Sequence, residues 1–254
     1  MDLNLTGRKA LVTGASRGIG RAIAAELAGE GCDLALCARG AEALEALAKE
    51  LREQGRTVYA QAVDVSDETA VTGFVQAAAQ ELSGLDIVIS NVSAGSVKGP
   101  GQWQTSFQAD LLAFVRLVEA ALPFLEQSDA AAVVALATTS AFDTLPPTSA
   151  NSYSALKAAV LQHASALGHA LAPKGIRVNT VSPGPTDFPG GDWDRLRQRR
   201  PEFYEAIQAR IPVGRLGRPE EVARAVTFLA SPAASFCTAA NLVVDGGFVS
   251  RVQA

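Results

Sequence analysis

Short apolar runs alternate with longer alanine- and leucine-rich stretches along most of the chain. The apolar runs, which are rich in β-branched residues, are typical of buried strands, and the stretches between them are typical of helices. Strands are predicted at 9–14, 32–38, 57–65, 85–90, 131–140, 176–183 and 241–247. Helices are predicted at 19–30, 41–54, 67–82, about 104–125, about 152–171 and 219–230.

This order of elements predicts an α/β fold. Near-continuous apolar strands joined by helices form a parallel sheet covered on both faces, so we expect one Rossmann-like, doubly wound domain of about seven strands. Neither a low-complexity linker nor a repeat divides the sequence, and the domain is predicted to span residues 1–254. After Pro183, Gly, Pro, charged residues and Trp193 predict an insertion at about 185–215 that covers the substrate.

Composition narrows the class of partner. Hydrophobic residues make up 48% of the chain, but apolar runs such as 130–137 are far shorter than the roughly 20 residues that span a membrane. The N-terminus lacks the basic and apolar regions of a secretory signal, so a cytoplasmic protein with no membrane partner is expected. A net charge of −4 offers no basic field to nucleic acid, and a small-molecule partner is therefore predicted.

Cysteine and histidine give no sign of a metal site. The three cysteines, Cys32, Cys37 and Cys237, have neither disulfide-like nor zinc-like spacing and are expected to be buried free thiols. His163 and His169 lie in one predicted helix without a second group of ligands, so no metal is expected.

A glycine-rich turn, TGASRGIG at 13–20, joins the first strand to the first helix. Gly14 permits a tight turn, Gly18 lets a pyrophosphate approach the backbone, and Gly20 lets the helix pack on the sheet. The helix N-terminus, with Ser16, Arg17 and Ile19 around it, offers N–H groups and a favourable dipole to an anion. A glycine-rich turn by itself is often only a turn, but this position in a βαβ series favours dinucleotide binding.

The end of the second strand indicates which dinucleotide binds. A carboxylate at this point would bind the ribose 2′-hydroxyl of NAD, but Ala38 stands there and Arg39 follows it. Arg39 and Arg17 together suit a 2′-phosphate, which accepts bidentate hydrogen bonds from guanidinium groups. NADP(H) is therefore predicted, and the alternative is that both arginines are solvated surface residues.

Tyr153 and Lys157 lie four residues apart in a predicted helix, so their side chains share one face. With the glycine-rich turn, this pair resembles the short-chain dehydrogenase/reductase family, and its 3-oxoacyl reductase-like branch in particular, over nearly the full length. Asp64 and Val65, which in the family touch the adenine, also match, as does Ser140 before Tyr153. The resemblance extends to the cofactor-binding positions Asn91, Pro183, Gly184 and Thr186.

The resemblance implies an NADPH-dependent oxidoreductase that reduces a ketone or a 3-oxoacyl-type carbonyl to an alcohol. Ser140 would hydrogen-bond the carbonyl oxygen, and Tyr153 would act as the general acid. Lys157 would hold the nicotinamide ribose, and its positive charge is expected to lower the phenol's pKa from its usual value near ~10. The family also implies a homotetramer or dimer, with the helices that carry Asp110 and Tyr153 as contact surfaces.

Two departures from the family pattern bear on the chemistry. Asp110 stands where the family has an Asn that supports a water relay to the lysine, and its charge is expected to raise the pKa of Lys157 and weaken the drive toward phenolate. The alternative is a protonated Asp110, or one that accepts the same hydrogen bonds. Ser93 stands at the final glycine of the family's N-N-A-G motif, and Gly95 is a candidate to compensate.

The substrate pocket is predicted between residues 141–151 and the cover at 185–200, with an apolar lining of Phe142, Leu145, Phe188 and Trp193. The run Arg195 to Arg200 is expected to be a solvated helix face, with recognition of a carboxylate or phosphate as the alternative. Two further functions stay open: a non-catalytic or weakly active NADP(H)-binding protein, and a 3-oxoacyl-[acyl-carrier-protein] reductase, for which Lys174 is the nearest basic docking residue.

Overall fold

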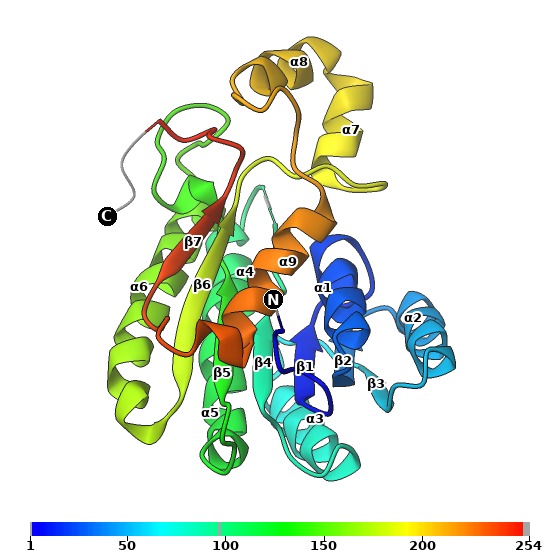
Figure 1. The fold of residues 1–254 in the computed structure, drawn as a ribbon. Coiled ribbons are helices and arrows are strands. Elements are labelled where there is room, and N and C mark those ends of the chain that lie inside the picture. Colours follow the sequence, from blue (N-terminus) through cyan, green and yellow to red (C-terminus); the bar gives the residue numbers. More distant parts are fainter. Residues whose placement is uncertain (1, 96–97, 251–254) are drawn as a thin grey trace.

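A computed structural model describes residues 2–95 and 98–250, which form a seven-stranded sheet with helices on both faces (Figure 1). The strand order is β3-β2-β1-β4-β5-β6-β7, and every neighbouring pair is parallel. The predicted doubly wound α/β fold is confirmed. The strands are β1 (Lys9–Thr13), β2 (Asp33–Ala38), β3 (Val58–Ala62), β4 (Ile87–Ser90), β5 (Ala132–Leu136), β6 (Arg177–Pro183) and β7 (Asn241–Val244).

The sheet separates two hydrophobic cores, because successive side chains of a strand point to opposite faces. Ala10 and Val12 of β1 belong to one core, whereas Leu11 belongs to the other. The first core is covered by α1 (Gly18–Gly29), α2 (Ala41–Glu53) and α9 (Pro219–Ala230). The second is covered by α3 (Glu68–Glu81), α5 (Ala113–Leu125) and α6 (Ser152–Leu171).

The predicted helix over 104–125 consists of three parts. They are α4 (Gln102–Ser106), a π-helical turn (Phe107–Leu112) and α5. The predicted strand 131–140 ends at Leu136, and a short 3₁₀ turn, Thr139–Ala141, follows it. Apolar patterning predicted neither the π-helical turn nor the early end of the strand, which is followed by the polar residues 138–140.

The cover after β6 contains two helices, α7 (Asp192–Arg199) and α8 (Pro201–Ala209), which project above the sheet in Figure 1. The sequence indicated a helix face only at Arg195 to Arg200, and α8 was not predicted. Trp193 stacks on Phe203 with ring centroids 6.5 Å apart and meets Tyr204 edge-on. These rings pack against the small core of Ile207, Ile211, Leu216 and Phe248. The cover therefore has its own apolar packing.

Within the described part of the chain, no helix combines the length and apolarity needed to cross a bilayer. Cys32 and Cys37 are buried free thiols, as predicted, and burial raises the pKa of each to about 12. Cys237 is only half-buried. Among residues 2–95 and 98–250, no three His, Cys, Asp or Glu side chains are placed to hold a metal ion.

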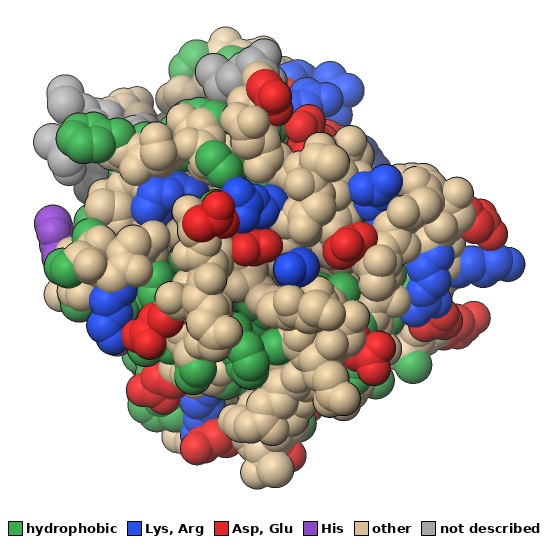
Figure 2. Space-filling view, turned by 60° about the horizontal axis from the view of Figure 1, so that its bottom comes forward, with side chains coloured by type: hydrophobic (Ala, Val, Ile, Leu, Met, Phe, Trp, Pro, Cys, Tyr) green, Lys and Arg blue, Asp and Glu red, His purple; other side chains and the backbone are tan. Residues whose placement is uncertain are grey.

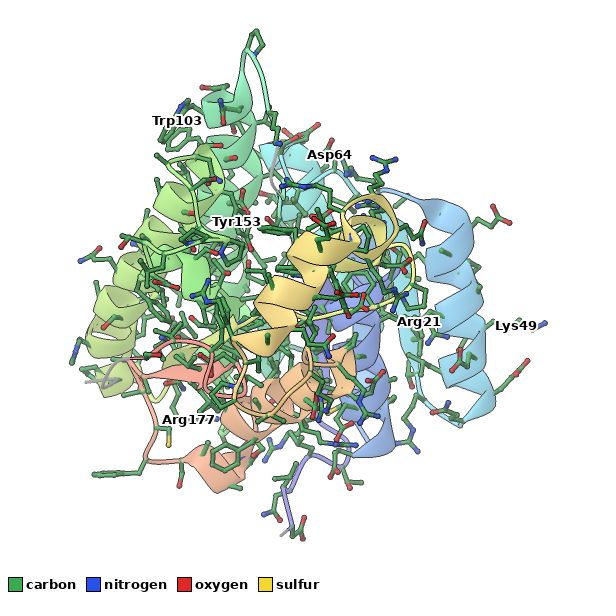
Figure 3. The ribbon with its side chains drawn as sticks, turned by 90° about the horizontal axis from the view of Figure 1, so that it is seen from above. Arg21, Lys49, Asp64, Trp103, Tyr153 and Arg177 are labelled. Atoms are coloured by element: carbon green, nitrogen blue, oxygen red, sulfur yellow. The ribbon has the colours of Figure 1, made fainter. Side chains whose placement is uncertain are left out.

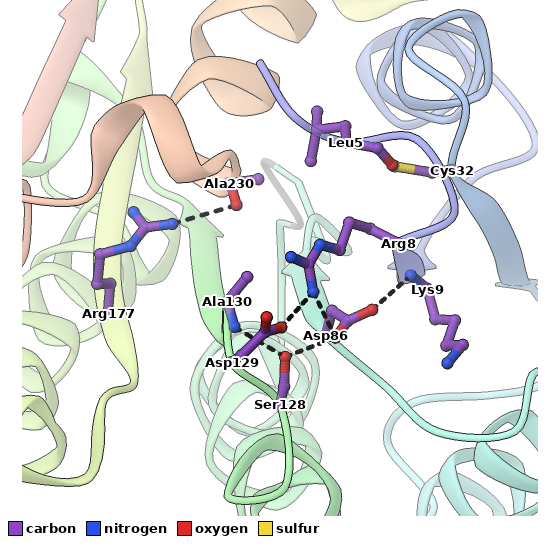
Figure 4. A network of polar contacts seen from close by, with 10 residues as sticks. All are labelled: Leu5, Arg8, Lys9, Cys32, Asp86, Ser128, Asp129, Ala130, Arg177 and Ala230. Atoms are coloured by element: carbon purple, nitrogen blue, oxygen red, sulfur yellow. Dashed lines mark hydrogen bonds and ion pairs between the residues drawn. The ribbon is translucent and has the colours of Figure 1, made fainter. Parts of the chain in front are cut away.

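A polar network ties the lower ends of the strands together (Figure 4). Asp86, 8% exposed, accepts hydrogen bonds from Lys9 N at 2.9 Å and Ser128 Oγ at 2.5 Å. Arg8 lies 3.7 Å from Asp86 and pairs more closely with the exposed Asp129. Acidic and basic side chains are interspersed over the face in Figure 2. Because the polar groups at this end of the strands pair with one another, we assign them a role in stability.

We expect Asp86→Ala to lower the free energy of unfolding by about 1–3 kcal/mol, because it leaves a buried amide and a hydroxyl without their acceptor. Urea denaturation measures this change. The matched control is Asp129→Ala, which removes an exposed partner of the same arginine and should change stability little. Equal losses in the two variants would contradict the assignment of Asp86 as the centre of the network.

Candidate active site

The carboxyl ends of the parallel strands meet at one edge of the sheet. The strand order reverses between β1 and β4, and such a switch point is where open α/β sheets bind ligands. Figure 3 looks down on this edge, and α7 and α8 lie over it in this view. Tyr153 and Asp64 are labelled there and come from different segments at the edge.

The glycine-rich turn follows β1 at the switch point. Gly14 and Gly18 have φ values of 68° and 54°, which glycine adopts without strain. A Cβ atom on Gly20 would lie 2.2 Å from Gly14 O, so only glycine allows α1 to pack this closely. Asn91 Nδ2 donates to Thr13 O at 3.0 Å and to Gly14 O at 3.2 Å. Asn91 thus fixes the turn to the end of β4.

The ring of Phe188 covers Gly18. A Cβ atom built on Gly18 would lie 2.6 Å from Phe188 Cζ, so the ring occupies the side on which the missing Cβ would let a phosphate approach. Gly191 N donates to Phe188 O at 2.9 Å, and this turn folds the ring back onto the glycine. Phe188 therefore lies over the phosphate-binding turn, whereas the sequence prediction placed it in the substrate pocket. A ligand that approached Gly18 from this side would meet the ring.

The expected adenosine end of the site lies beyond β2 and β3. Ser66 N and Ser66 Oγ donate to Asp64 Oδ1 at 3.0 and 2.7 Å. These hydrogen bonds lower the pKa of Asp64, and the positive charge of Arg39 lowers it further. Arg39 is exposed and Val65 is buried. The structure therefore brings an exposed guanidinium and an ionised carboxylate together where the adenosine half was predicted.

The remaining predicted cofactor residues surround the same edge. Ser16, Arg17 and Gly18 line a groove of about 630 Å³ beside α1, together with Phe188. Arg17 reaches the cover and donates to Gly190 O at 3.5 Å. Ile19 packs against the first core, Pro183 ends β6, Gly184 lies directly against Asp245, and Thr186 Oγ1 donates to Gly184 O at 3.0 Å.

Helix α6 presents the tyrosine and the lysine. Asn151 Oδ1 accepts from Ser154 N at 2.9 Å and so caps the helix immediately before Tyr153. Lys157, one turn later, donates from Nζ to Leu136 O at 2.8 Å. The same Nζ lies 3.4 Å from Asp110 Oδ1, and the two side chains are only 4% and 0% exposed. Lys157 is therefore held between the end of β5 and a buried carboxylate.

Ser140 lies in the 3₁₀ turn that packs on α6, four residues beyond the end of β5. Its backbone N donates to Thr138 Oγ1 at 3.3 Å. The Thr138 side chain also lies within hydrogen-bonding reach of the Tyr153 phenol. Thr138 is a site residue that sequence reasoning missed, because its only signal was its position between β5 and Ser140.

The pKa of Tyr153 is raised to about 12, opposite to the expected direction. Loss of hydration is the largest cause, the Thr138 hydrogen bond opposes it, and the negative charges of Asp110 and Asp192 add to the rise. Burial also lowers the pKa of Lys157 overall, although Asp110 acts to raise it, as predicted. The expectation failed because the loss of hydration on burial dominates the shift of the phenol, and the nearby acids add to it.

The second departure from the family pattern closes a local turn. Ser93 Oγ accepts from Gly95 N at 2.9 Å, and Gly95 has a φ of 67°. A glycine two positions later thus supplies the backbone freedom at this point, in agreement with the compensating role considered for Gly95.

The predicted pocket lining is only partly assembled. Leu145 is 62% exposed, Trp193 packs within the cover, and Phe142 is half-buried beside Ser140 in the chain. Arg210 donates to Pro146 O and thereby joins the end of α8 to the loop after Ser140. Two of the three arginines of α7 pair with neighbouring acids, Arg195 with Asp192 and Arg197 with Asp187 and Asp194.

Comparison with known proteins agrees with this geometry. The model of a family described as Enoyl-(Acyl carrier protein) reductase matches residues 14–249. Isoepoxydon dehydrogenase patN of Aspergillus clavatus is 40% identical over 251 residues, which cover 96% of this chain and 95% of that protein. The chain belongs to the short-chain dehydrogenase/reductase family.

Other relatives share nearly the whole length. Cis-4-hydroxycyclohexanecarboxylate dehydrogenase of Sinomonas cyclohexanicum is 36% identical, covering 96% of this chain and 97% of that protein. The 3-oxoacyl-[acyl-carrier-protein] reductase FabG of Vibrio cholerae is 32% identical, covering 96% and 98%. The crystal structure of L-sorbose reductase from Gluconobacter frateurii, complexed with NADPH and L-sorbose, has a TM-score of 0.89 at 29% identity, covering 99% and 100%.

We expect Phe188→Ala to bind NADPH more tightly, by up to about tenfold or roughly 1.4 kcal/mol, because no ring then has to leave Gly18. Fluorescence titration with NADPH measures the affinity. Phe236→Ala is the matched control, since Phe236 is fully exposed outside the site and should leave the affinity unchanged. Weaker binding in Phe188→Ala would mean that the ring holds the cofactor.

Proposed function

We propose that this protein is an NADPH-dependent reductase that converts the ketone of a small molecule into a secondary alcohol. The observation that carries the proposal is the placement of Tyr153 beside the buried Lys157–Asp110 pair, at the edge where the glycine-rich turn lies. Bound NADPH supplies the hydride. Tyr153 gives its proton to the carbonyl oxygen, and Ser140 donates a hydrogen bond to that oxygen.

The residues present fit NADP(H) once Phe188 has moved. The backbone of Gly14, Ser16 and Gly18 would hold the pyrophosphate at the N-terminus of α1, which has no acidic residue in its first turn. The exposed Arg39, with Arg17, would hold the 2′-phosphate. The NADPH complex of L-sorbose reductase, which shares the fold at TM-score 0.89, supports this choice of cofactor.

A ring ketone is the substrate class that we propose first. The name of the Sinomonas relative describes a secondary alcohol on a cyclohexane ring, and that protein aligns with nearly the whole chain. The loop after Ser140, which was predicted to shape the substrate pocket, is joined to the end of α8 by the hydrogen bond from Arg210 to Pro146 O. Cyclic ketones and their alcohols therefore lead the substrate panel.

The acyl-carrier alternative has less support. The FabG relative favours it, but a carrier protein is acidic and needs a basic docking surface. Lys174, the basic residue considered for this role, is paired with Glu126 at 2.6 Å. A non-catalytic NADP(H)-binding protein is the other alternative, and the retention of Ser140, Tyr153 and Lys157 argues against it.

Tyr153→Phe should lower kcat for ketone reduction at least about 100-fold, because the general acid is lost, while NADPH binding persists. Steady-state assays with NADPH and a panel of cyclic ketones and 3-oxoesters measure the loss. Tyr59→Phe is the matched control, since its hydroxyl donates only to Gln61 on β3 and should not affect turnover. Tight NADPH binding by the native protein without turnover across the panel would favour the non-catalytic alternative.

Arg39→Asp should weaken NADPH binding and strengthen NADH binding, changing the affinity ratio at least about tenfold, because a carboxylate repels the 2′-phosphate and accepts from a 2′-hydroxyl. Dissociation constants for both cofactors measure the ratio. Lys49→Asp makes the same charge change on the exposed face of α2 and should leave the ratio unchanged. An unchanged ratio in Arg39→Asp would remove Arg39 from the cofactor site.

A further inference from the structure

The side chain of Asp110 is completely buried and points into the catalytic cluster, yet neither carboxylate oxygen has a hydrogen-bond partner among the described residues. Its one close charge is Lys157 Nζ, 3.4 Å from Oδ1. An ionised carboxylate is stable at such a depth only beside a compensating charge. The carboxylate and the ammonium therefore form one neutral unit.

The backbone fixes this arrangement. Asp110 lies in the π-helical turn Phe107–Leu112, which changes the phase of side chains between α4 and α5, and such turns recur at functional sites. Directly before the turn, the hydroxyls of Ser106 and Ser152 are 2.8 Å apart and both residues are fully buried. This contact joins α4 to α6 next to Tyr153 and holds Asp110 opposite Lys157.

Few other charges act on the cluster. α4 carries no charged residue, and α5 carries only Arg116, which pairs with Glu68, and the exposed Glu119. α6 contributes Tyr153, Lys157 and two histidines farther along, of which His163 packs edge-on against Phe114. From the cover, Asp192 adds a second negative charge that acts on the phenol. Lys157, one turn along α6 from Tyr153, is thus paired with Asp110, and the charges of Asp110 and Asp192 that act on the phenol are negative.

We propose that Asp110 is a positioning residue that neutralises Lys157 and so keeps Tyr153 in its protonated phenol form throughout the neutral pH range. This inference rests on the proposed function and adds to it a pH dependence. Ketone reduction uses the phenol and retains its rate into the alkaline range. Alcohol oxidation uses the phenolate as base and rises only at higher pH.

The charges determine in which direction the ionisation of Tyr153 should shift when Asp110 is replaced. Removing the charge of Asp110 leaves Lys157 as an unpaired cation, and the Tyr153–Lys157 pair then releases its first proton at lower pH. In Asp110→Asn, phenolate should therefore appear at lower pH than in the native protein, by about one pH unit or more. Asp110→Glu keeps the charge and should restore a titration close to the native one.

Phenolate absorbance during a pH titration of the unliganded protein tests this directly. The chain has only three tyrosines, so subtracting the curve of Tyr153→Phe isolates Tyr153. We expect native Tyr153 to ionise above the ordinary tyrosine value and Asp110→Asn to ionise below the native value. Native ionisation at or below the ordinary value would overturn the proposal, and that comparison does not require Asp110→Asn to fold.

Enzyme kinetics give the second readout. The pH profile of kcat/KM for alcohol oxidation should move to lower pH in Asp110→Asn by the same amount as the absorbance titration. Asp192→Asn, on the cover, should shift this pH profile by a smaller amount. Superimposable profiles and titrations for the native protein and Asp110→Asn would refute the role of Asp110 even in an active reductase. Absence of turnover with every substrate, together with the expected titrations, would instead refute the proposed function alone.

Discussion

Parallel strand pairing is the constraint from which the rest of the molecule follows. A parallel strand can be reached only by a crossover, and the crossovers here are helices that bury both faces of the sheet. Polar groups of the sheet therefore gather at its two ends, where the strands begin and where they end. One edge holds the Asp86 network, and the other collects the glycine turn, Asn91, Thr138 and the start of α6. Stability and chemistry are thus separated along the strands.

The buried Lys157–Asp110 pair sets the electrostatics of the candidate active site. Removing either charge from water is unfavourable, and the attraction between them offsets that cost only because both are held in place. Leu136 O accepts a hydrogen bond from the ammonium, and the π-helical turn holds the carboxylate. The attraction that makes burial tolerable also cancels the field that an unpaired lysine would exert on Tyr153. The raised pKa of the phenol follows first from its loss of hydration, and the negative charges of Asp110 and Asp192 add to the rise.

The fold was predictable because its signals are local and repeated. Helix 152–171 and helix 219–230 were predicted with the bounds that the structure gives, and seven apolar runs predicted seven strands. For the site, the identities and spacings of residues predicted which side chains take part, but not how they contact one another. Neither the π-helical turn, the Phe188–Gly18 contact nor the reach of Thr138 to Tyr153 leaves a periodic signal, since each depends on packing between distant segments. The pKa shift of Tyr153 was predicted with the wrong sign because residue identities reveal the charge of Lys157 but not how far the fold withdraws the phenol from water, which is the largest cause of the shift.

The cover connects the two halves of the site. Phe188 lies on the phosphate-binding turn, Arg17 reaches Gly190, and a few residues later Asp192 acts on the phenol of Tyr153. The cover is fixed at its base, where Asp187 N donates to Gly217 O and Thr186 pairs with Gly217. Because one short segment carries these contacts, residues 187–192 link the glycine-rich turn to the surroundings of Tyr153.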